Sequence, residues 1–419
     1  MLGACGGPRQ STSSNRERQG ERLPTADPQA ARADLTTLTD ATRSRNAWIE
    51  VDLDALDGNL AAVRRVVGPR VEIIAVVKAN AYGAGVEGVA PALEAAGVDR
   101  LAVVWPAEGV ALRRSGARIP IIVLGHAFPA DAAAAVAHDL TLTCHSFALG
   151  EELSAAAVEQ GRVARVHLKI DTGLHRFGVT VEESVALGEA LRRLPGVEVE
   201  GLTTHLANAD EPDDAFSDVQ HERFVAIAAR LPWIPYRHTA NSATALRRAE
   251  LRFDGVRVGL ALHGVQPENT PDAALRPILS VKARVARVTA ISKGEGVSYG
   301  LRWRPNRQSQ VALIPVGYGD GWRRTLGNRG EVLIGGHRCR MVGTLCMDQF
   351  LADVTDLPSV GEGDEVVLIG RQGVEEISAA EVARLADTIP WDVFASLQAR
   401  LPRIYHRGGR VERIVEGQG

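Results

Sequence analysis

The stretch Val71-Glu-Ile-Ile-Ala-Val-Val-Lys78-Ala-Asn-Ala-Tyr82-Gly83 begins with a short, almost continuously apolar run that ends at a lysine. An amphipathic segment rich in alanine follows it at 86–96. A strand that is apolar on both faces and is followed by a helix is typical of a parallel sheet covered by helices. The stretch therefore predicts a β/α unit, and the same pattern recurs along the chain.

Seven further apolar runs alternate with amphipathic segments. The predicted strands are Ile73–Lys78, Leu101–Val104, Ile121–Gly125, Leu140–His145, Arg165–Asp171, Val199–His205, Tyr236–Ala240 and Val256–Leu262. The predicted helices include Val86–Ala96, Ala148–Gln160, Val181–Leu194 and Asp214–Leu231. Eight β/α units in roughly 200 residues favour a closed (β/α)8 barrel over residues 47–278. A doubly wound open sheet is the alternative.

From about Leu279 the pattern changes to short β-type runs separated by Gly, Pro and Asp. These runs are Val281–Ile291, Gln310–Val316, Glu331–Ile334, Arg338–Val342, Phe350–Val354 and Glu365–Ile369. They predict a mainly antiparallel β domain over 279–410, which the first strand, at 47–53, is expected to join. The segment Ser378–Leu385 is predicted to be a helix with Ser378 as its N-cap.

The composition excludes several classes of partner. The 419 residues carry 48 Lys+Arg and 51 Asp+Glu, a formal net charge of −3, so nucleic acid and anionic membranes are not expected to bind. No apolar run approaches the roughly 18 residues that span a bilayer. Residues 1–46 are polar and poor in large apolar groups, so we expect this segment to be disordered.

The four cysteines, Cys5, Cys144, Cys339 and Cys346, form no C-x-x-C pair and are too few for a disulfide scaffold. We expect reduced thiols and a cytoplasmic protein. Cys5 follows Leu2-Gly3-Ala4, as in a lipoprotein signal, but no apolar stretch precedes it. Export through a signal that this sequence lacks stays open.

In a barrel the chemistry lies at the carboxyl ends of the strands. Lys78 closes the first predicted strand, where a buried lysine is costly unless its charge is paired or its pKa falls. A lowered pKa suits an amine that attacks a carbonyl carbon or removes a proton. The alternative is a lysine that extends from the strand end into water.

Polar residues follow the later strands as well. They are Lys169, Asp171 and Arg176 after the fifth, His205 after the sixth, Asn241 and Ser242 after the seventh, and Arg257 and Gly259 in the eighth. Gly and Ser near the last two strands fit the usual phosphate site of a barrel, where backbone N–H groups surround an anion. A lysine opposite a phosphate site is typical of pyridoxal phosphate enzymes.

The segment Ala75–Gly83 resembles the cofactor-lysine signature of the alanine racemase family. Seven further segments agree with the family in the same order. They are His167–Gly178, Thr204-His205, Asn241-Ser242, Arg257–Gly259, Val297–Gly300, Gly317–Gly321 and Cys346–Gln349. The resemblance extends from Trp48 to Arg407, and its many ordered motifs make it specific. It implies the same fold as the pattern above, a barrel followed by a β domain.

The resemblance implies a pyridoxal-5'-phosphate-dependent racemase that interconverts L- and D-alanine and supplies D-alanine for peptidoglycan. Lys78 would hold the cofactor and act as one base. Tyr299, from the other subunit of a head-to-tail homodimer, would be the base on the opposite face. A phenol has an ordinary pKa near 10 and needs help to ionise, which His205 and Arg257 would provide. Arg257 would also face the pyridine nitrogen and keep it unprotonated.

The remaining family positions would bind the cofactor and a small amino acid substrate. Tyr82, Ser242, Gly259 and Leu260 would hold the phosphate, beside the contacts of Lys78 and Arg257. Arg176 and the backbone of Met347 would bind the substrate carboxylate. Lys169 matches a position that is often carbamylated. The resemblance implies no metal ion.

Alternative activities stay open at this point. Ala399 stands where some relatives have a tyrosine that narrows the alanine pocket, so a racemase with broader or serine-preferring specificity is one alternative, unless Trp303 or Trp322 fills the space. A pyridoxal-phosphate-dependent amino acid decarboxylase is disfavoured because its Gly-rich phosphate loop and its cysteine motif are not found. A non-catalytic cofactor-binding protein is disfavoured by the complete β domain with Tyr299.

Overall fold

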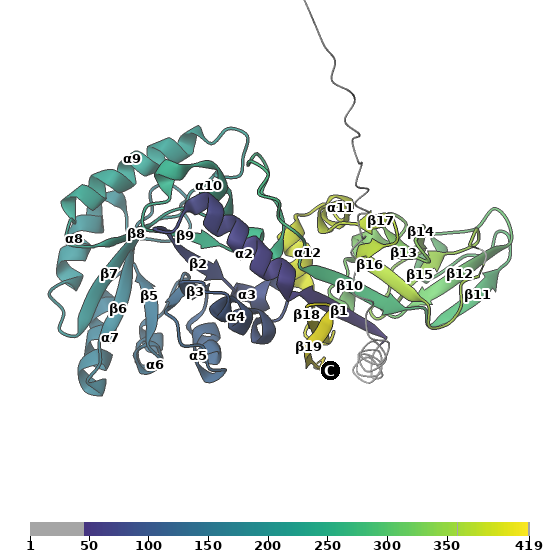
Figure 1. Ribbon diagram of the computed structural model, residues 1–419, viewed down its shortest axis with the longest axis horizontal. Helices are drawn as coiled ribbons and strands as arrows, with labels where there is room; N and C mark the ends of the chain where they lie inside the picture. Colours follow the sequence, from purple (N-terminus) through teal and green to yellow (C-terminus); the bar gives the residue numbers. More distant parts are fainter. Residues whose placement is uncertain (1–45, 358, 418–419) are drawn as a thin grey trace, which may run out of the picture.

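Eight parallel strands close into a barrel in the order β2-β3-β4-β5-β6-β7-β8-β9, with helices on its outside (Figure 1). The computed structural model describes residues 46–357 and 359–417. The strands are β2 (Glu72–Val76), β3 (Arg100–Val103), β4 (Ile121–Val123), β5 (Leu140–Cys144), β6 (Ala164–Lys169), β7 (Val197–Thr203), β8 (Tyr236–His238) and β9 (Gly255–Val258). Pairing of β2 with β9 closes the barrel, so the predicted barrel is confirmed and an open sheet is excluded. The predicted disordered segment, with Cys5, lies outside the described residues except for Asn46.

The barrel helices alternate with the strands, as the pattern predicts, and the first of them precedes β2. They are α2 (Leu53–Val67), α4 (Val86–Ala95), α5 (Pro106–Arg114), α6 (Ala132–Ala137), α7 (Phe147–Gln160), α8 (Val181–Leu191), α9 (Ala215–Arg230) and α10 (Ser242–Arg247), with the short turn α3 (Lys78–Tyr82) after β2. All five residues of β5 are buried, as a strand covered on both faces requires. In α7 the side chain of Ser146 accepts a hydrogen bond from the N–H of Leu149, which caps the helix.

The inside of the barrel is divided between apolar and polar side chains. Ile74, Val76, Ala102, Ile122 and Tyr236 form an apolar cluster. Buried polar residues lie next to this cluster, which are His167, Lys169, Thr203, His238 and Arg257. Burying such groups is unfavourable unless they pair with one another, so we expect these side chains to form a hydrogen-bonded network.

A second, mainly antiparallel sheet follows the barrel, with strand order β11-β12-β15-β14-β13-β16-β10-β1-β18-β19 and with β17 on β16. Its strands are β1 (Ala47–Asp52), β10 (Leu279–Arg284), β11 (Arg287–Ile291), β12 (Ser309–Ile314), β13 (Glu331–Ile334), β14 (His337–Val342), β15 (Phe350–Asp353), β16 (Glu365–Gln372), β17 (Glu375–Ile377), β18 (Arg403–Arg407) and β19 (Arg410–Val415). β1 pairs antiparallel with β10 and parallel with β18, so the described chain starts in this sheet and α2 carries it to the barrel (Figure 1).

One predicted strand of the β domain is wrong. The single run Val281–Ile291 is divided between β10, which pairs with β1 and β16, and β11, which pairs with β12. The change of partner occurs at Val285 and Ala286, whose N–H groups bond to Asp364 and Leu313 respectively. Both halves have a β-type sequence, so they look like one continuous strand. The local pattern does not reveal that the two halves pair with different strands.

Two short helices complete the β domain. The predicted helix is confirmed as α11 (Ala379–Leu385), and the side chain of Ser378 caps it by accepting from the N–H of Glu381. The second helix, α12 (Pro390–Ser396), was not predicted. No helix in the described part of the chain combines the length and the apolar character needed to cross a membrane.

The β domain is hydrogen-bonded to the barrel at the loop that follows α3. The hydroxyl of Tyr405 donates to the carbonyls of Ala84 and Gly85 at 3.0 and 3.2 Å, and Arg403 donates to the carbonyl of Gly83 at 3.1 Å. A Cβ at Gly83 would lie 2.0 Å from the Phe394 carbonyl oxygen, and one at Gly85 would lie 2.0 Å from the Tyr405 hydroxyl. The spacing of Gly83, Gly85 and Gly88 resembles a dinucleotide-binding loop, but here it serves close packing between the two domains.

Candidate active site

Lys78 lies just beyond β2, because the strand ends at Val76, two residues earlier than predicted. The following residues, Ala79–Tyr82, all have φ between 50° and 54° and form one left-handed turn. Left-handed backbone costs L-residues roughly 1–2 kcal/mol each, so neighbouring contacts must hold this turn. Within it, the N–H of Ala81 bonds to Val77 and that of Gly83 bonds to Ala79, at 3.0 and 3.1 Å.

A cavity of about 960 Å³ opens at the carboxyl ends of the barrel strands. Nine of the predicted site residues line it, which are Lys78, Tyr82, Lys169, Arg176, His205, Ser242, Arg257, Gly259 and Leu260. The cavity is of the size that binding sites for cofactors and small substrates have. The structure therefore brings together residues from α3, from the ends of β6, β7 and β9, and from α10.

Some lining residues were missed by the sequence prediction. They are Trp105, His126, Phe177, Asp210, Ile389, Trp391, Asp392 and Ala395, among others. Those from α12 come from the β domain of the same chain and cover one side of the cavity mouth. Pro390 at the first helical position was the one local signal of that helix, and it says nothing about where the helix packs.

One end of the cavity is lined by uncharged hydrogen-bond donors. The hydroxyl oxygen of Ser242 accepts from the N–H groups of Gly259 and Ala261, at 3.2 and 3.4 Å. Gly259 leaves room for Tyr82, because a Cβ there would lie 2.5 Å from the Tyr82 hydroxyl oxygen. Burial raises the pKa of Tyr82 to about 12, so its hydroxyl keeps its proton and can donate. Hydroxyl and backbone N–H donors around a glycine suit a phosphate group.

A chain of hydrogen bonds starts at Arg257, which lines the cavity, and continues through histidine rings. The guanidinium donates to Nδ1 of His205 at 3.0 Å and to Nδ1 of His238 at 2.8 Å. Both Nδ1 atoms are therefore acceptors, so in the neutral rings the proton is on Nε2. Nε2 of His238 then donates to Nδ1 of His167 at 2.8 Å. Burial and the charge of Arg257 hold the pKa of His205 and of His238 well below its usual value, which keeps both rings neutral.

One hydrogen-bond donor of Arg257 remains available to a ligand. Its two NH2 groups make six hydrogen bonds, to Thr203, His238, Thr204, His205 and Thr239. Its Nε–H has no partner among the described residues, although Arg257 is 5% exposed and lines the cavity. Burial lowers the pKa of Arg257 to about 10, which still leaves it protonated at neutral pH. A pyridine nitrogen that accepts from this N–H would stay unprotonated, so the residues present fit pyridoxal phosphate at both ends.

Two lysines share the cavity with Arg176. Burial and the nearby Arg176 lower the pKa of Lys78, while Glu108 acts in the opposite direction. Lys169 is 6% exposed, and burial together with Arg257 and Arg176 lowers its pKa well below the usual value. A lysine with a lowered pKa has a larger neutral fraction, and the neutral amine is the form that reacts with a carbonyl carbon or takes a proton.

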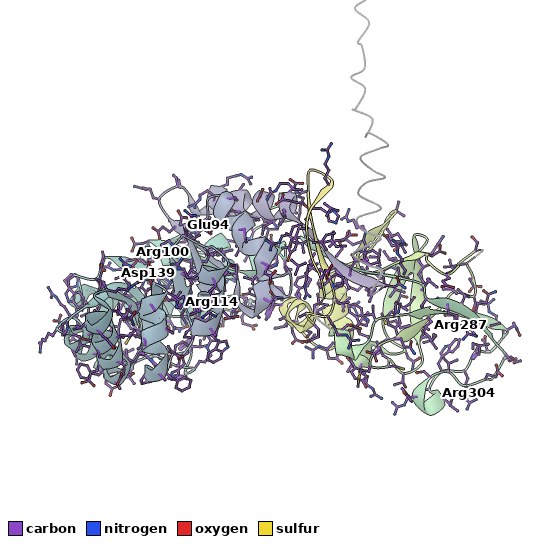
Figure 2. All side chains as sticks on the ribbon, turned by 90° about the horizontal axis from the view of Figure 1, so that it is seen from below. Glu94, Arg100, Arg114, Asp139, Arg287 and Arg304 are labelled. Atoms are coloured by element: carbon purple, nitrogen blue, oxygen red, sulfur yellow. The ribbon has the colours of Figure 1, made fainter. Side chains whose placement is uncertain are left out.

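Tyr299 and Met347 are not brought to this cavity. Tyr299 lies in the turn Tyr299–Leu301 between β11 and β12, and Met347 lies in the loop before β15. Their exposed fractions are 72% and 52%, and both line a shallow pocket on the β domain. β11 and β12 form the end of the molecule that is farthest from the barrel (Figure 1), where Figure 2 labels Arg287 and Arg304.

Two family models match the chain, "Alanine racemase, N-terminal domain" over residues 51–267 and "Alanine racemase, C-terminal domain" over residues 278–405. The alanine racemase of Symbiobacterium thermophilum is 45% identical over 372 residues, which cover 86% of this chain and 97% of the relative. The alanine racemase of Halothermothrix orenii is 39% identical over 368 residues, with 86% and 97% covered.

Solved structures agree with these matches. The alanine racemase of Bacillus anthracis with bound L-Ala-P superposes with a TM-score of 0.84 at 36% identity, covering 89% of this chain and 98% of that one. The alanine racemase of a D-cycloserine-producing Streptomyces lavendulae gives 0.82 at 35% identity, with 87% and 97% covered. The chain therefore belongs to the alanine racemase family, and its activity is the pyridoxal-phosphate-dependent interconversion of L- and D-alanine.

Proposed function

We propose that Lys78 and Tyr299 of the partner subunit are the two bases of this racemisation, one on each face of the substrate Cα. The observation that carries this proposal is that Tyr299 is exposed on the β domain and does not line the cavity, whereas Lys78 does. A head-to-tail homodimer would insert the β domain of one chain into the cavity mouth of the other. The exposed Met347 would enter with it.

Inversion needs a proton removed from one face of Cα and another delivered to the opposite face. Bound pyridoxal phosphate supplies one thing, which is stabilisation of the negative charge left on Cα. Lys78, with its lowered pKa, removes or returns the proton on its own face. Tyr299 of the partner subunit does the same on the other face, and the reverse reaction exchanges the two roles.

His205 would help that phenol lose its proton. Because Arg257 occupies its Nδ1, the neutral ring presents Nε2–H as a donor toward the cavity. A hydrogen bond to the ionised phenol oxygen lowers the pKa of a phenol. The guanidinium of Arg257, which donates to Nδ1 of His205 at 3.0 Å, adds a fixed positive charge next to this ring.

Arg176 and the backbone N–H of Met347 of the partner subunit would hold the substrate carboxylate. Arg176 follows β6 and lines the cavity, where a guanidinium can bind a carboxylate through two parallel hydrogen bonds. Lys169 lies in the same part of the barrel, with its Nζ 5.6 Å from the centre of the Phe177 ring. Its lowered pKa enlarges the neutral fraction of the amine, which is the form that carbamylation requires, and carbamylation of Lys169 stays a prediction.

The overall proposal is tested by incubating the purified chain with L-alanine in deuterated water. We expect D-alanine to accumulate until the two enantiomers are equal, with deuterium at Cα, because each inversion replaces the Cα hydrogen by one from solvent. Ethylamine and carbon dioxide as products would indicate a decarboxylase instead. Unchanged L-alanine in the presence of bound cofactor would indicate a cofactor-binding protein without turnover.

Replacing Gly259 with alanine should weaken cofactor binding. The added Cβ would lie 2.5 Å from the Tyr82 hydroxyl oxygen and push it away from the phosphate. Loss of one hydrogen bond to a charged group costs about 1.5–3 kcal/mol, which is roughly a tenfold to hundredfold higher Kd. The measurement is equilibrium dialysis against pyridoxal phosphate. Gly361→Ala is the control, because a Cβ there meets nothing within 4 Å; equal Kd values for both variants would contradict the prediction.

The substrate range is predicted to include serine. Ala399 is exposed after α12, and none of Ala399, Trp303 and Trp322 is among the described residues that line the cavity, so a small residue at 399 leaves its space unfilled. An unobstructed pocket discriminates against one extra heavy atom by only about 1–3 kcal/mol. We expect L-serine to react at more than roughly a hundredth of the rate of L-alanine. Ala399→Tyr should lower the serine rate more than the alanine rate, and an unchanged ratio would contradict this.

A further inference from the structure

Glu108 makes contacts that its role as a helix cap does not explain. It is the third residue of α5, and its Oε2 accepts from the N–H of Trp105, the N-cap residue, at 3.0 Å. That contact is the usual one for an acidic residue at this position. The same Oε2 also accepts from the N–H of Val104 at 2.9 Å.

The other carboxylate oxygen leaves the helix altogether. Oε1 of Glu108 accepts from the N–H of Ala79 at 2.8 Å, across to the neighbouring β2 segment. β2 and β3 are adjacent parallel strands, so one carboxylate joins the chain just after both of their carboxyl ends. Ala79 follows Lys78 directly and is the first residue of the left-handed turn. Glu108 therefore holds the backbone where it leaves β2. Lys78, which lines the cavity, is the residue directly before this contact.

The turn that Glu108 holds at its first residue is held at its end by other groups. The N–H of Gly85 bonds to the carbonyl of Asn80 at 3.0 Å, and the side chain of Asn80 accepts from the N–H of Val86 at 2.8 Å. β18 secures the loop beyond through Arg403 and Tyr405. Four consecutive left-handed residues persist only where the surroundings determine them, and Glu108 is the side-chain acceptor on the Lys78 side.

The charge of Glu108 acts on Lys78 as well. The groups that act on the ammonium are Arg176 from the loop after β6, His205 from beyond β7, Tyr82, whose ring centre is 6.0 Å from Nζ, and Glu108 from α5. Burial and Arg176 lower the pKa of Lys78, and Glu108 raises it. Glu108 is the one acidic group among them, so it limits how far the pKa falls.

We propose that Glu108 is a positioning residue for the reaction, which sets the orientation of Lys78 through the Ala79 N–H and balances its charge through the carboxylate. This rests on the proposed role of Lys78 and adds a group that does not itself touch the substrate. The carboxylate links the ends of two strands beside Lys78, because Oε1 accepts from the N–H of Ala79 and Oε2 accepts from the N–H of Val104.

The test separates this role from helix capping. Glu108→Gln keeps the size but removes the charge and one of the two acceptor oxygens, and Glu108→Ala removes the whole group. The matched control is Glu183→Gln. Glu183 is the third residue of α8, and its carboxylate accepts from its own N-cap Thr180 at 2.7 Å without reaching another strand.

The first readout needs no turnover. The cofactor-free full-length chain is acetylated at a series of pH values, and mass spectrometry follows Lys78 against the exposed Lys293. In both Glu108 variants we expect the Lys78 profile to shift to lower pH, because the group that raises its pKa is gone. In Glu183→Gln the profile should match that of the unchanged chain. Equal profiles in all three variants and the unchanged chain would overturn the proposal.

The second readout is kcat/KM of the cofactor-loaded enzyme with L-alanine. We expect a decrease of roughly tenfold to hundredfold in Glu108→Gln, as for the loss of a hydrogen bond to a charged acceptor, and no comparable decrease in Glu183→Gln. If Tm and kcat/KM decrease by the same amounts in Glu108→Gln and in Glu183→Gln, Glu108 is only a helix cap. If Lys78 proves not to be a base, the acetylation profile still reports on Glu108, so the two failures are distinguishable.

Discussion

Lys78→Ala is expected to lower kcat/KM for L-alanine by at least about 10³-fold, because the change removes a general base and the covalent anchor of the cofactor together. Lys78 lines the cavity, and burial and Arg176 lower its pKa, so a larger fraction of the amine is in its neutral, reactive form. The control is Lys293→Ala, which removes an exposed lysine of the β domain and should leave the rate unchanged.

The chemical readout is borohydride reduction followed by peptide mass spectrometry. In the unchanged chain the reduced cofactor should be found on the peptide that contains Lys78. In Lys78→Ala the cofactor should still bind through Tyr82, Ser242 and Gly259 but should dialyse away after reduction. A variant that keeps a tenth of the activity, or that carries reduced cofactor on Lys169, would contradict the assignment of Lys78.

The sequence predicts the barrel well because its evidence is local. Each strand is buried on both faces and therefore reads as an apolar run, and each is followed by an amphipathic helix. The same argument predicts which residues meet at the cavity, since the carboxyl ends of all eight strands lie on one face of a barrel. Lys78, Lys169, His205 and Arg257 are found together for this reason.

The features that the sequence did not reveal depend on contacts between distant segments. The left-handed turn after Lys78 is held by Glu108, and the loop beyond it by Arg403 and Tyr405, all far from it in sequence. Helix α12 has an ordinary local pattern, and its place over the cavity follows from packing against α3. The division of 281–291 into two strands depends on which neighbours each half pairs with.

Tyr299 was identified from the family motif alone, and no physical pattern in the chain distinguishes it. The structure shows it exposed and outside the cavity that Lys78 lines, so a single chain does not bring the two residues together. The proposed catalytic role of Tyr299 therefore requires a second subunit that brings this residue to the cavity.

Tyr299→Phe is expected to lower racemisation by roughly 10²–10⁴-fold in both directions, because the ring stays and only the ionisable oxygen is lost. Cofactor binding should be unchanged, since Tyr82, Ser242 and Gly259, which are expected to hold the phosphate, stay in place. With one base left, Lys78 can still exchange the Cα hydrogen of one enantiomer with solvent. In deuterated water we expect one of L- and D-alanine to gain deuterium without inverting. Deuterium gain by both enantiomers at equal rates would contradict the assignment of one base to each face.

Mixing the two inactive variants tests whether the site is shared between subunits. In a dimer of one Lys78→Ala chain and one Tyr299→Phe chain, one site lacks both bases and the other has Lys78 and Tyr299 intact. Random exchange makes half of the dimers mixed, so about a quarter of the original activity should return. If both bases came from one chain, every site in the mixture would lack one of them and no activity would return. Recovery on mixing therefore requires that Tyr299 of the partner subunit faces Lys78, as the separation of the two residues within one chain implies.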